Sequence, residues 1–301
     1  MQPKIKSSGR QFSTDNQSSF RFDLPLIAKP IRTRYWRPGD NFLGIIIGAV
    51  ADSCDDGDII VVSEKAISVA MGRVVDESKV APSFMAKFLV RVWTRLLWGY
   101  FLGPLCHLNR KTLWRLRQYP IPEGEAHKEI ALRYAGFSQS LLHYSEGGID
   151  VTNLPYALAA VPLSDSQEVG RKVLRAIKEA CGRDVSVMIT DTDKTCSRKG
   201  IHITARPRAF GGIKTLGLAA FIVGRVLGWT ARATPLAVCD GAFSAEEALT
   251  VADVADRARG YGAGRTVWDM ARKFRVGLTE VTWDMLDEVR HYPIVIVRKI
   301  R

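Results

Sequence analysis

The strongest constraint on the fold is a continuous β-branched run, Ile59-Ile60-Val61-Val62, that follows a turn at Gly57-Asp58. A short apolar run without polar interruption is typical of a strand buried within a sheet. The preceding residues 40–53 are apolar with polar ends, which favours a helix. The sequence therefore predicts a helix–strand unit around a buried strand.

Strand and helix patterns alternate along the rest of the chain, which predicts a mixed α+β fold. A helix is expected at 164–181, where Asp165 can cap the first turn together with Glu168, and Gly182 can end the last turn. A strand is expected directly afterwards, at 185–189. Further strands are expected at 156–163, 200–205, 235–239 and 293–298, and further helices at 244–259, 266–274 and 279–290.

Composition indicates a globular protein of a reducing compartment. The 301 residues are 47% hydrophobic and 25% charged, enough for one large core or two moderate ones. The five cysteines are scattered and form no C-x-x-C pair, so neither a disulfide framework nor a zinc site is expected, and a cytoplasmic location fits best. Residues 1–19 are polar and basic without an apolar core, which predicts a disordered tail rather than a signal peptide.

The chain carries a formal net charge of +12. A charge of this sign attracts nucleotides, nucleic acid, anionic lipid or a polyanionic substrate without distinguishing among them. No RNA-binding signature, zinc finger or basic heptad array accompanies the charge, so nucleic-acid binding is not expected as the main role.

A basic, tryptophan-rich segment occupies residues 82–119. Lys87, Arg91 and Arg95 are spaced by four, which places them in one stripe on an otherwise apolar helix that Gly103-Pro104 should end. Three charges argue against a membrane span. We expect this helix to pack on the protein core or on a second subunit, with the stripe in solvent. Location on an anionic membrane surface is the alternative.

Two polar segments carry candidate metal ligands. They are Gly147-Gly148-Ile149-Asp150-Val151-Thr152-Asn153 and Ile189-Thr190-Asp191-Thr192-Asp193, and each follows or ends an apolar segment. Carboxylate and hydroxyl oxygens suit Mg²⁺ or Mn²⁺, which take their other ligands from water and nucleotide. Gly147-Gly148 would let the backbone approach a ligand closely. From the residues alone, an ordinary turn explains the first segment, and a helix cap or surface loop explains the second, better than a metal site does.

The ordered motifs resemble one known family. They are Asp23-Leu24-Pro25-Leu26-Ile27, Gly57-Asp58-Ile59-Ile60-Val61-Val62 with Lys65, Gly72-Arg73-Val74-Val75, and the two segments with Asp150 and Asp191. Their order and spacing are similar to those of the coenzyme F420-0:gamma-glutamyl ligase family, over about residues 22–80 and 143–240. The resemblance implies an α+β fold with mixed sheets and flanking helices.

The resemblance also implies an activity, ligands and partners. Enzymes of this family use GTP, with ATP as the alternative here, and Mg²⁺ or Mn²⁺. They activate a carboxylate of an anionic acceptor as an acyl phosphate, which the amine of glutamate attacks. The family assembles as homodimers. The implied metal ligands are Asp150, Asp191 and Thr192, and the implied nucleotide contacts are Leu24, Pro25, Leu26, Ile27, Lys65 and Asn153.

The sequence also departs from the family pattern. Glu64 precedes Lys65 where serine is common, and Val69 replaces a second lysine. Residues 193–198 replace a Phe-Gly-Arg-Pro-Trp-Arg segment on the substrate side, which leaves the acceptor open. Two alternatives therefore remain: a homologue that only binds a nucleotide or acidic ligand without catalysis, and a membrane-surface or nucleic-acid-binding protein on the same fold.

An insertion at about residues 82–142 has no counterpart in the compact enzymes. We expect it within a ligase-like domain at 20–240, followed at 241–301 by a helical segment that ends in a strand. A histidine of near-neutral pKa, His127 or His143, could move a proton during amide formation, and Glu146 could add a metal ligand. The alternative is that both histidines lie on a helix surface or at an interface.

Overall fold

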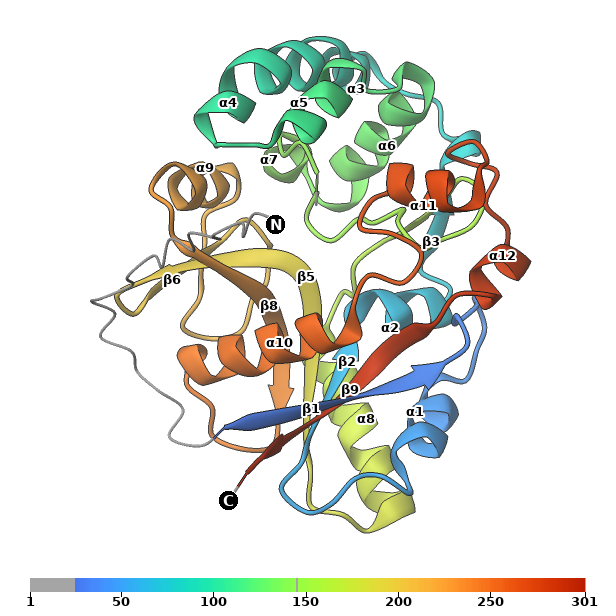
Figure 1. Cartoon of the computed structure of the whole chain (residues 1–301), viewed down its shortest axis with the longest axis vertical. Helices are drawn as coiled ribbons and strands as arrows, with labels where there is room; N and C mark the ends of the chain where they lie inside the picture. Colours follow the sequence, from blue (N-terminus) through green and yellow to red (C-terminus); the bar gives the residue numbers. More distant parts are fainter. Residues whose placement is uncertain (1–24, 145, 301) are drawn as a thin grey trace, which may run out of the picture.

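A computed structural model of the chain describes residues 25–144 and 146–300. The tail expected at 1–19 and the candidate residue Leu24 lie outside this part. The predicted mixed α+β fold is confirmed, with one large sheet flanked by helices and a helical layer at one end (Figure 1).

The large sheet has the strand order β1-β9-β2-β5-β6-β7, and β8 pairs with β5. β2 runs parallel to β5 and antiparallel to β9. Because β9 lies between β1 and β2, the C-terminal segment completes this sheet. The strands are β1 (Leu26–Thr33), β2 (Ile59–Ser63), β5 (Ser186–Arg198), β6 (Ile201–Thr204), β7 (Lys214–Thr215), β8 (Thr230–Cys239) and β9 (His291–Lys299).

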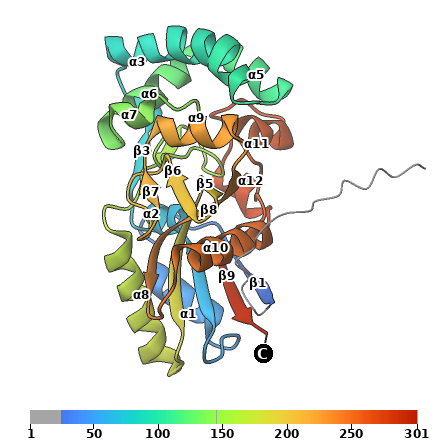
Figure 2. The ribbon, with the colours of Figure 1, turned by 90° about the vertical axis from the view of Figure 1, so that its left-hand side faces the viewer.

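β2 is buried on both faces, as its sequence predicts. Ile60 and Val62 pack toward α1 (Phe42–Val50) and α8 (Ser166–Cys181), whereas Ile59 and Val61 pack toward α10 (Ala245–Arg259). Figure 2 shows these helices on opposite sides of the sheet. The remaining helices of the main body are α2 (Glu64–Ala70), α9 (Leu218–Val226), α11 (Val267–Phe274) and α12 (Trp283–Asp287).

Local sequence explains where α8 begins and ends. The side chain of Asp165 accepts a hydrogen bond from the backbone N–H of Glu168, and Gly182 ends the helix in the left-handed conformation at φ 62°. The helix expected at 279–290 is shorter, because Thr282 caps α12 and the helix ends at Asp287. The strand expected at 156–163 is likewise reduced to β4 (Leu158–Ala160).

β5 differs most from its prediction. The expected strand at 185–189 continues to Arg198, so Asp191 and Thr192 lie inside the strand rather than at its end. β8 begins earlier than expected and pairs along this extension. The register between β5 and β8 shifts between Asp191 and Lys194. Such an irregularity redirects side chains and often lies beside functional sites.

The insertion lies between two short strands that pair with each other, β3 (Val74–Asp76) and β4. Its helices form the layer at the top of Figure 1. They are η1 (Glu77–Lys79), α3 (Phe84–Phe88), the π-helix η2 (Leu89–Leu102), α4 (Gly103–Leu105), α5 (Arg110–Arg117), α6 (Ile121–Tyr134) and α7 (Phe137–Ser140). As expected, η2 ends at Gly103-Pro104: its last residue is Leu102 and Gly103 is its C-cap. The proline lies in the first turn of the short α4, where its missing N–H is tolerated.

Truncation of Ile189 tests the importance of the buried face of β5. Ile189 is 0% exposed within the core beneath α8, so Ile189→Ala should lower the free energy of unfolding by about 2–5 kcal/mol. Ile27→Ala on the same sheet is the control, because that side chain is 54% exposed and should change the value by less than about 0.5 kcal/mol. Urea unfolding measures both, and equal effects would contradict the assignment of the core.

Candidate active site

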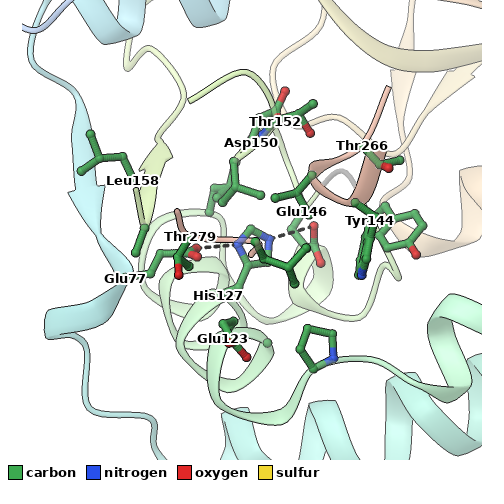
Figure 3. A pocket seen from close by; sticks show the side chains of 18 of the residues that line it. Glu77, Glu123, His127, Tyr144, Glu146, Asp150, Thr152, Leu158, Thr266 and Thr279 are labelled. Carbon is green, nitrogen blue, oxygen red and sulfur yellow. Dashed lines mark hydrogen bonds and ion pairs between the residues drawn. The ribbon is translucent and has the colours of Figure 1, made fainter. Parts of the chain in front are cut away.

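The two aspartate segments meet at one cavity of about 260 Å³, which we call the carboxylate cavity. Asp150 enters from the segment before β4, whereas Asp191 and Thr192 enter from the irregular part of β5. The insertion forms another part of the wall through His127, and Glu146 lies beside this histidine (Figure 3). The three predicted metal-ligating residues therefore lie around a common space.

Lys65 and backbone groups hold the Asp150 carboxylate in place. Lys65 lies in the first turn of α2, and its Nζ donates to Asp150 Oδ2 at 2.8 Å and to the carbonyl of Thr152 at 2.9 Å. The backbone N–H of Thr152 donates to Asp150 Oδ1 at 2.6 Å. The backbone of Asp150 also pairs with Ala160 in β4. Lys65, predicted as a phosphate contact, thus lies directly beside the candidate metal ligand.

A buried arginine links Asp191 to Glu64. Arg206 Nη2 donates to Glu64 Oε2 at 2.5 Å, and its Nε lies 2.8 Å from Asp191 Oδ2. Burial raises the pKa of Glu64 despite the opposing charge of Arg206. The guanidinium passes over Gly148, where φ is +95° and an added Cβ would collide with it. Gly148 therefore makes room for Arg206, and it also lines the carboxylate cavity, so the expected close approach of its backbone to a ligand stays a prediction.

Gly148→Ala should destabilise the protein through this arginine. The added methyl would displace Arg206 from between two buried carboxylates and would strain the backbone, which should lower the free energy of unfolding by at least about 2 kcal/mol. Gly39→Ala is the control, since its φ is +89° but an added Cβ would meet nothing within 4 Å. Its cost should be about 1 kcal/mol. Equal losses in urea unfolding would show that Arg206 contributes nothing.

A second cavity, of about 410 Å³, adjoins the first. We call it the glycine-loop cavity, because the loop at residues 260–265, Gly-Tyr-Gly-Ala-Gly-Arg, forms part of its wall. Asp150, Thr152, Thr192 and Arg265 line both cavities. Its charged lining comprises the cations Lys65, Lys194, Arg259 and Arg265 and the carboxylates Asp150 and Asp256. This excess of positive charge favours an anionic ligand.

Asn153 positions the glycine loop. Its Oδ1 accepts a hydrogen bond from the backbone N–H of Ala263 at 2.7 Å, and its Nδ2 donates to the carbonyl of Tyr261 at 3.2 Å. Asn153 also lines the glycine-loop cavity, so its predicted contact with a nucleotide remains a prediction. Sequence reasoning missed the loop itself, although three glycines in five residues after a predicted helix were a visible signal.

Comparison with known proteins identifies the family. The F420-0:Gamma-glutamyl ligase family matches residues 30–256. The chain belongs to this ligase family. It is 33% identical to the uncharacterized protein MJ1361 of Methanocaldococcus jannaschii over 284 residues, which cover 90% of this chain and 96% of that protein. It is also 27% identical to the coenzyme F420:L-glutamate ligase of Methanothermobacter thermautotrophicus over 168 residues, 54% of this chain and 59% of that protein.

The ligase-family match begins after the segment expected to touch the nucleotide. Leu24, Pro25, Leu26 and Ile27 all precede residue 30. Leu26 and Ile27 pair with the last residues of β9. The glycine-loop cavity instead adjoins the other end of β1, through Tyr35 and Trp36. The structure therefore does not bring Pro25, Leu26 and Ile27 into the site.

Val69 replaces the second lysine of the ligase family within the wall of the glycine-loop cavity. The side chain is buried against Leu154 and Ala160. The cationic groups on this side of the cavity therefore come from other elements. Lys194 lies in β5, Arg259 directly precedes the glycine loop, and Arg265 is the last residue of that loop.

His127 is a buried cation rather than a neutral base. Its Nδ1 lies 2.7 Å from Glu77 Oε1 and its Nε2 lies 3.4 Å from Glu146 Oε2 (Figure 3). Burial alone would lower the pKa of His127, but Glu77 and Glu146 together raise it to about 10. The expectation of a near-neutral pKa was therefore wrong for this residue, because two carboxylates face its ring.

Glu146 is fully engaged by cations. Although burial opposes its charge, Lys128 and His127 hold the pKa of Glu146 well below its usual range. Lys128 Nζ donates to Glu146 Oε1 at 2.7 Å and also to the carbonyl of Ser140. Both carboxylate oxygens of Glu146 thus have cationic partners, which does not favour a role as an additional metal ligand.

His143 lies in the interior and lines neither cavity itself. Its ring packs against Trp98, Tyr144 and Phe221. Burial lowers the pKa of His143 to about 3. It is therefore neutral at ordinary pH, and it lies neither on a helix surface nor at the candidate site.

The two histidines should show opposite protonation states in solution. The imidazole nitrogens of His127 should carry both protons at about pH 8, because its pKa is about 10, whereas His143 should stay neutral at about pH 5. Nitrogen NMR of the imidazole rings measures this, with His127→Gln and His143→Gln assigning the signals. A His127 signal that titrates near neutral pH would restore its candidacy as a proton carrier.

Proposed function

We propose that the protein is a nucleotide- and metal-dependent ligase that joins the amine of glutamate to a carboxylate of an anionic acceptor. Membership of the F420-0:gamma-glutamyl ligase family supports a ligase activity. One observation gives the strongest support for the proposed nucleotide and metal dependence. Asp150 and Thr192 line both adjoining cavities, so groups held in the two cavities would meet at these side chains.

The glycine-loop cavity is the proposed nucleotide side. Lys65 and Lys194 contribute ammonium groups, which pair with Asp150 and Asp256, and Arg265 contributes a guanidinium at the boundary with the carboxylate cavity. The net positive lining suits a triphosphate, whose negative charge must be neutralised before its terminal phosphoryl group can be transferred. The carboxylate cavity is then the acceptor side.

The oxygen donors fit a hard divalent cation. Asp150, Asp191 and Thr192 offer two carboxylates and a hydroxyl to one cavity, and each carboxylate has about four lone-pair sites, of which the ion pairs use only part. Among the described residues, no group of three or more His, Cys, Asp or Glu side chains is arranged to hold a metal ion. Water and phosphate oxygens would therefore complete the shell of Mg²⁺ or Mn²⁺, which would neutralise phosphate charge.

The proposed reaction needs positioning but no protein nucleophile. An acceptor carboxylate oxygen attacks the terminal phosphorus, and the bond to the nucleoside diphosphate breaks. The glutamate amine then attacks the acyl carbon, the bond to phosphate breaks, and the amine proton leaves with phosphate or water. Lys65 keeps Asp150 oriented and Arg206 keeps Asp191 oriented, and the His127 imidazolium offsets the negative charges of Glu77 and Glu146 on the acceptor side.

Asparagine substitutions test the proposal. With GTP or ATP, glutamate, Mg²⁺ and a phosphorylated deazaflavin acceptor, the protein should release inorganic phosphate, and Asp150→Asn or Asp191→Asn should slow release by at least about 100-fold. Asp184→Asn is the matched control, because Asp184 has an 84% exposed side chain and lines neither cavity. Absence of phosphate release and of metal-dependent binding with both nucleotides would contradict the proposal.

A further inference from the structure

An exposed apolar stripe runs along the outer side of the inserted helices. Phe84 is 84% exposed, Leu96 51% and Phe101 67%, which is unusual for side chains of this size. The opposite side of the same helices is buried, through Leu89, Thr94 and Trp98. The stripe consists of Phe84, Phe88, Val92, Leu96, Phe101 and Leu105.

The π-helical geometry of η2 places the side chains of this stripe on one face of the helix. In a π-helix each N–H donates to the carbonyl five residues back, as Gly103 does to Trp98. One turn therefore contains more residues than a turn of an α-helix, so side chains four or five positions apart fall on the same face. The stripe follows that spacing from Phe88 to Leu105.

The segment that carries the apolar stripe contains basic residues but no acidic ones. Residues 82–118 contain seven lysines and arginines and no aspartate or glutamate: Lys87, Arg91, Arg95, Arg110, Lys111, Arg115 and Arg117. Lys87 and Arg110 are exposed. Arg91 is 58% exposed even though it pairs with Glu125 of α6. Sequence analysis predicted one solvent-exposed basic row of Lys87, Arg91 and Arg95. Lys87 and Arg91 are exposed as expected, whereas Arg95 donates a hydrogen bond to the carbonyl of Arg117.

The position of these helices leaves the stripe accessible. Both views place α3 and α5 at one end of the molecule, with α6 and α9 between them and the sheet (Figures 1 and 2). α4 lies at the same end in Figure 1. Trp114 of α5 is 63% exposed at the same end. Tryptophan beside basic and apolar residues is typical of helices that lie in the membrane interface.

We propose that this end of the protein docks on the anionic surface of a lipid bilayer. The apolar stripe enters the boundary between headgroups and acyl chains, while Lys87 and Arg110 face the phosphates. In the described part of the chain no helix is long and apolar enough to span a membrane, so the contact is peripheral. A second copy of the chain fits this face poorly, because a symmetric contact would place two segments that carry only positive charge against each other.

Vesicle sedimentation with the full chain tests the proposal. The protein should bind vesicles of phosphatidylcholine with phosphatidylglycerol, and high salt should weaken the binding. The variant Phe88→Ser/Leu96→Ser/Phe101→Ser should bind at least about tenfold more weakly, because it loses the apolar contact. Lys87→Glu/Arg110→Glu should also weaken binding, and native protein should bind pure phosphatidylcholine at least about tenfold less.

The control variant is Ile27→Ser/Met71→Ser/Ile201→Ser, which removes three exposed apolar side chains outside the inserted helices. It should bind vesicles as the native protein does, and urea unfolding should confirm that all variants fold. Equal binding by the stripe variant and the native protein would overturn the proposal, as would binding that does not depend on anionic lipid. Loss of a dimer in the stripe variant, without vesicle binding by the native protein, would identify a second copy as the occupant instead.

Discussion

The candidate site depends on one buried ion-pair network, in which Arg206 lies between Glu64 and Asp191. It joins the first turn of α2 to the irregular part of β5, while the backbone at Gly148 passes directly beneath the guanidinium. Removing these charges from water costs several kcal/mol per ion, and only close pairing offsets that cost. The network therefore fixes the relative position of the two aspartate segments, which are distant in sequence.

Local sequence patterns predicted the elements that are determined locally. The run at Ile59–Val62 became a buried strand, and Asp165 with Gly182 set the ends of α8. β6 and β9 were also found close to their expected positions, but the extent of β5 and β8, which depends on pairing partners, was mispredicted. β5 continues through Asp191 because β6 and β8 provide backbone partners along its extension, and the polar residues there have no strand pattern that a local reading could detect.

The candidate site, like the fold, could be predicted from the sequence only in part. The order of the family motifs predicted that Asp150, Asp191, Thr192 and Lys65 lie near one another, and the structure places them around the two adjoining cavities. The same motifs also assigned to the site a segment at the far end of β1, which the structure places elsewhere. The charge state of His127 could not be predicted, because it depends on Glu77, fifty residues earlier in the chain. Electrostatic environments of this kind arise only after distant segments have packed.

The pairing of β3 with β4 has a consequence for the position of the insertion. These strands bring the two ends of the insertion side by side, so a long segment can be gained between them without changing the register of the large sheet. The insertion contributes His127 to the carboxylate cavity, whereas Lys65 and the glycine loop belong to the main body. The fold thus places the inserted segment against only one of these two cavities, and the residues that line the glycine-loop cavity are positioned by the main body.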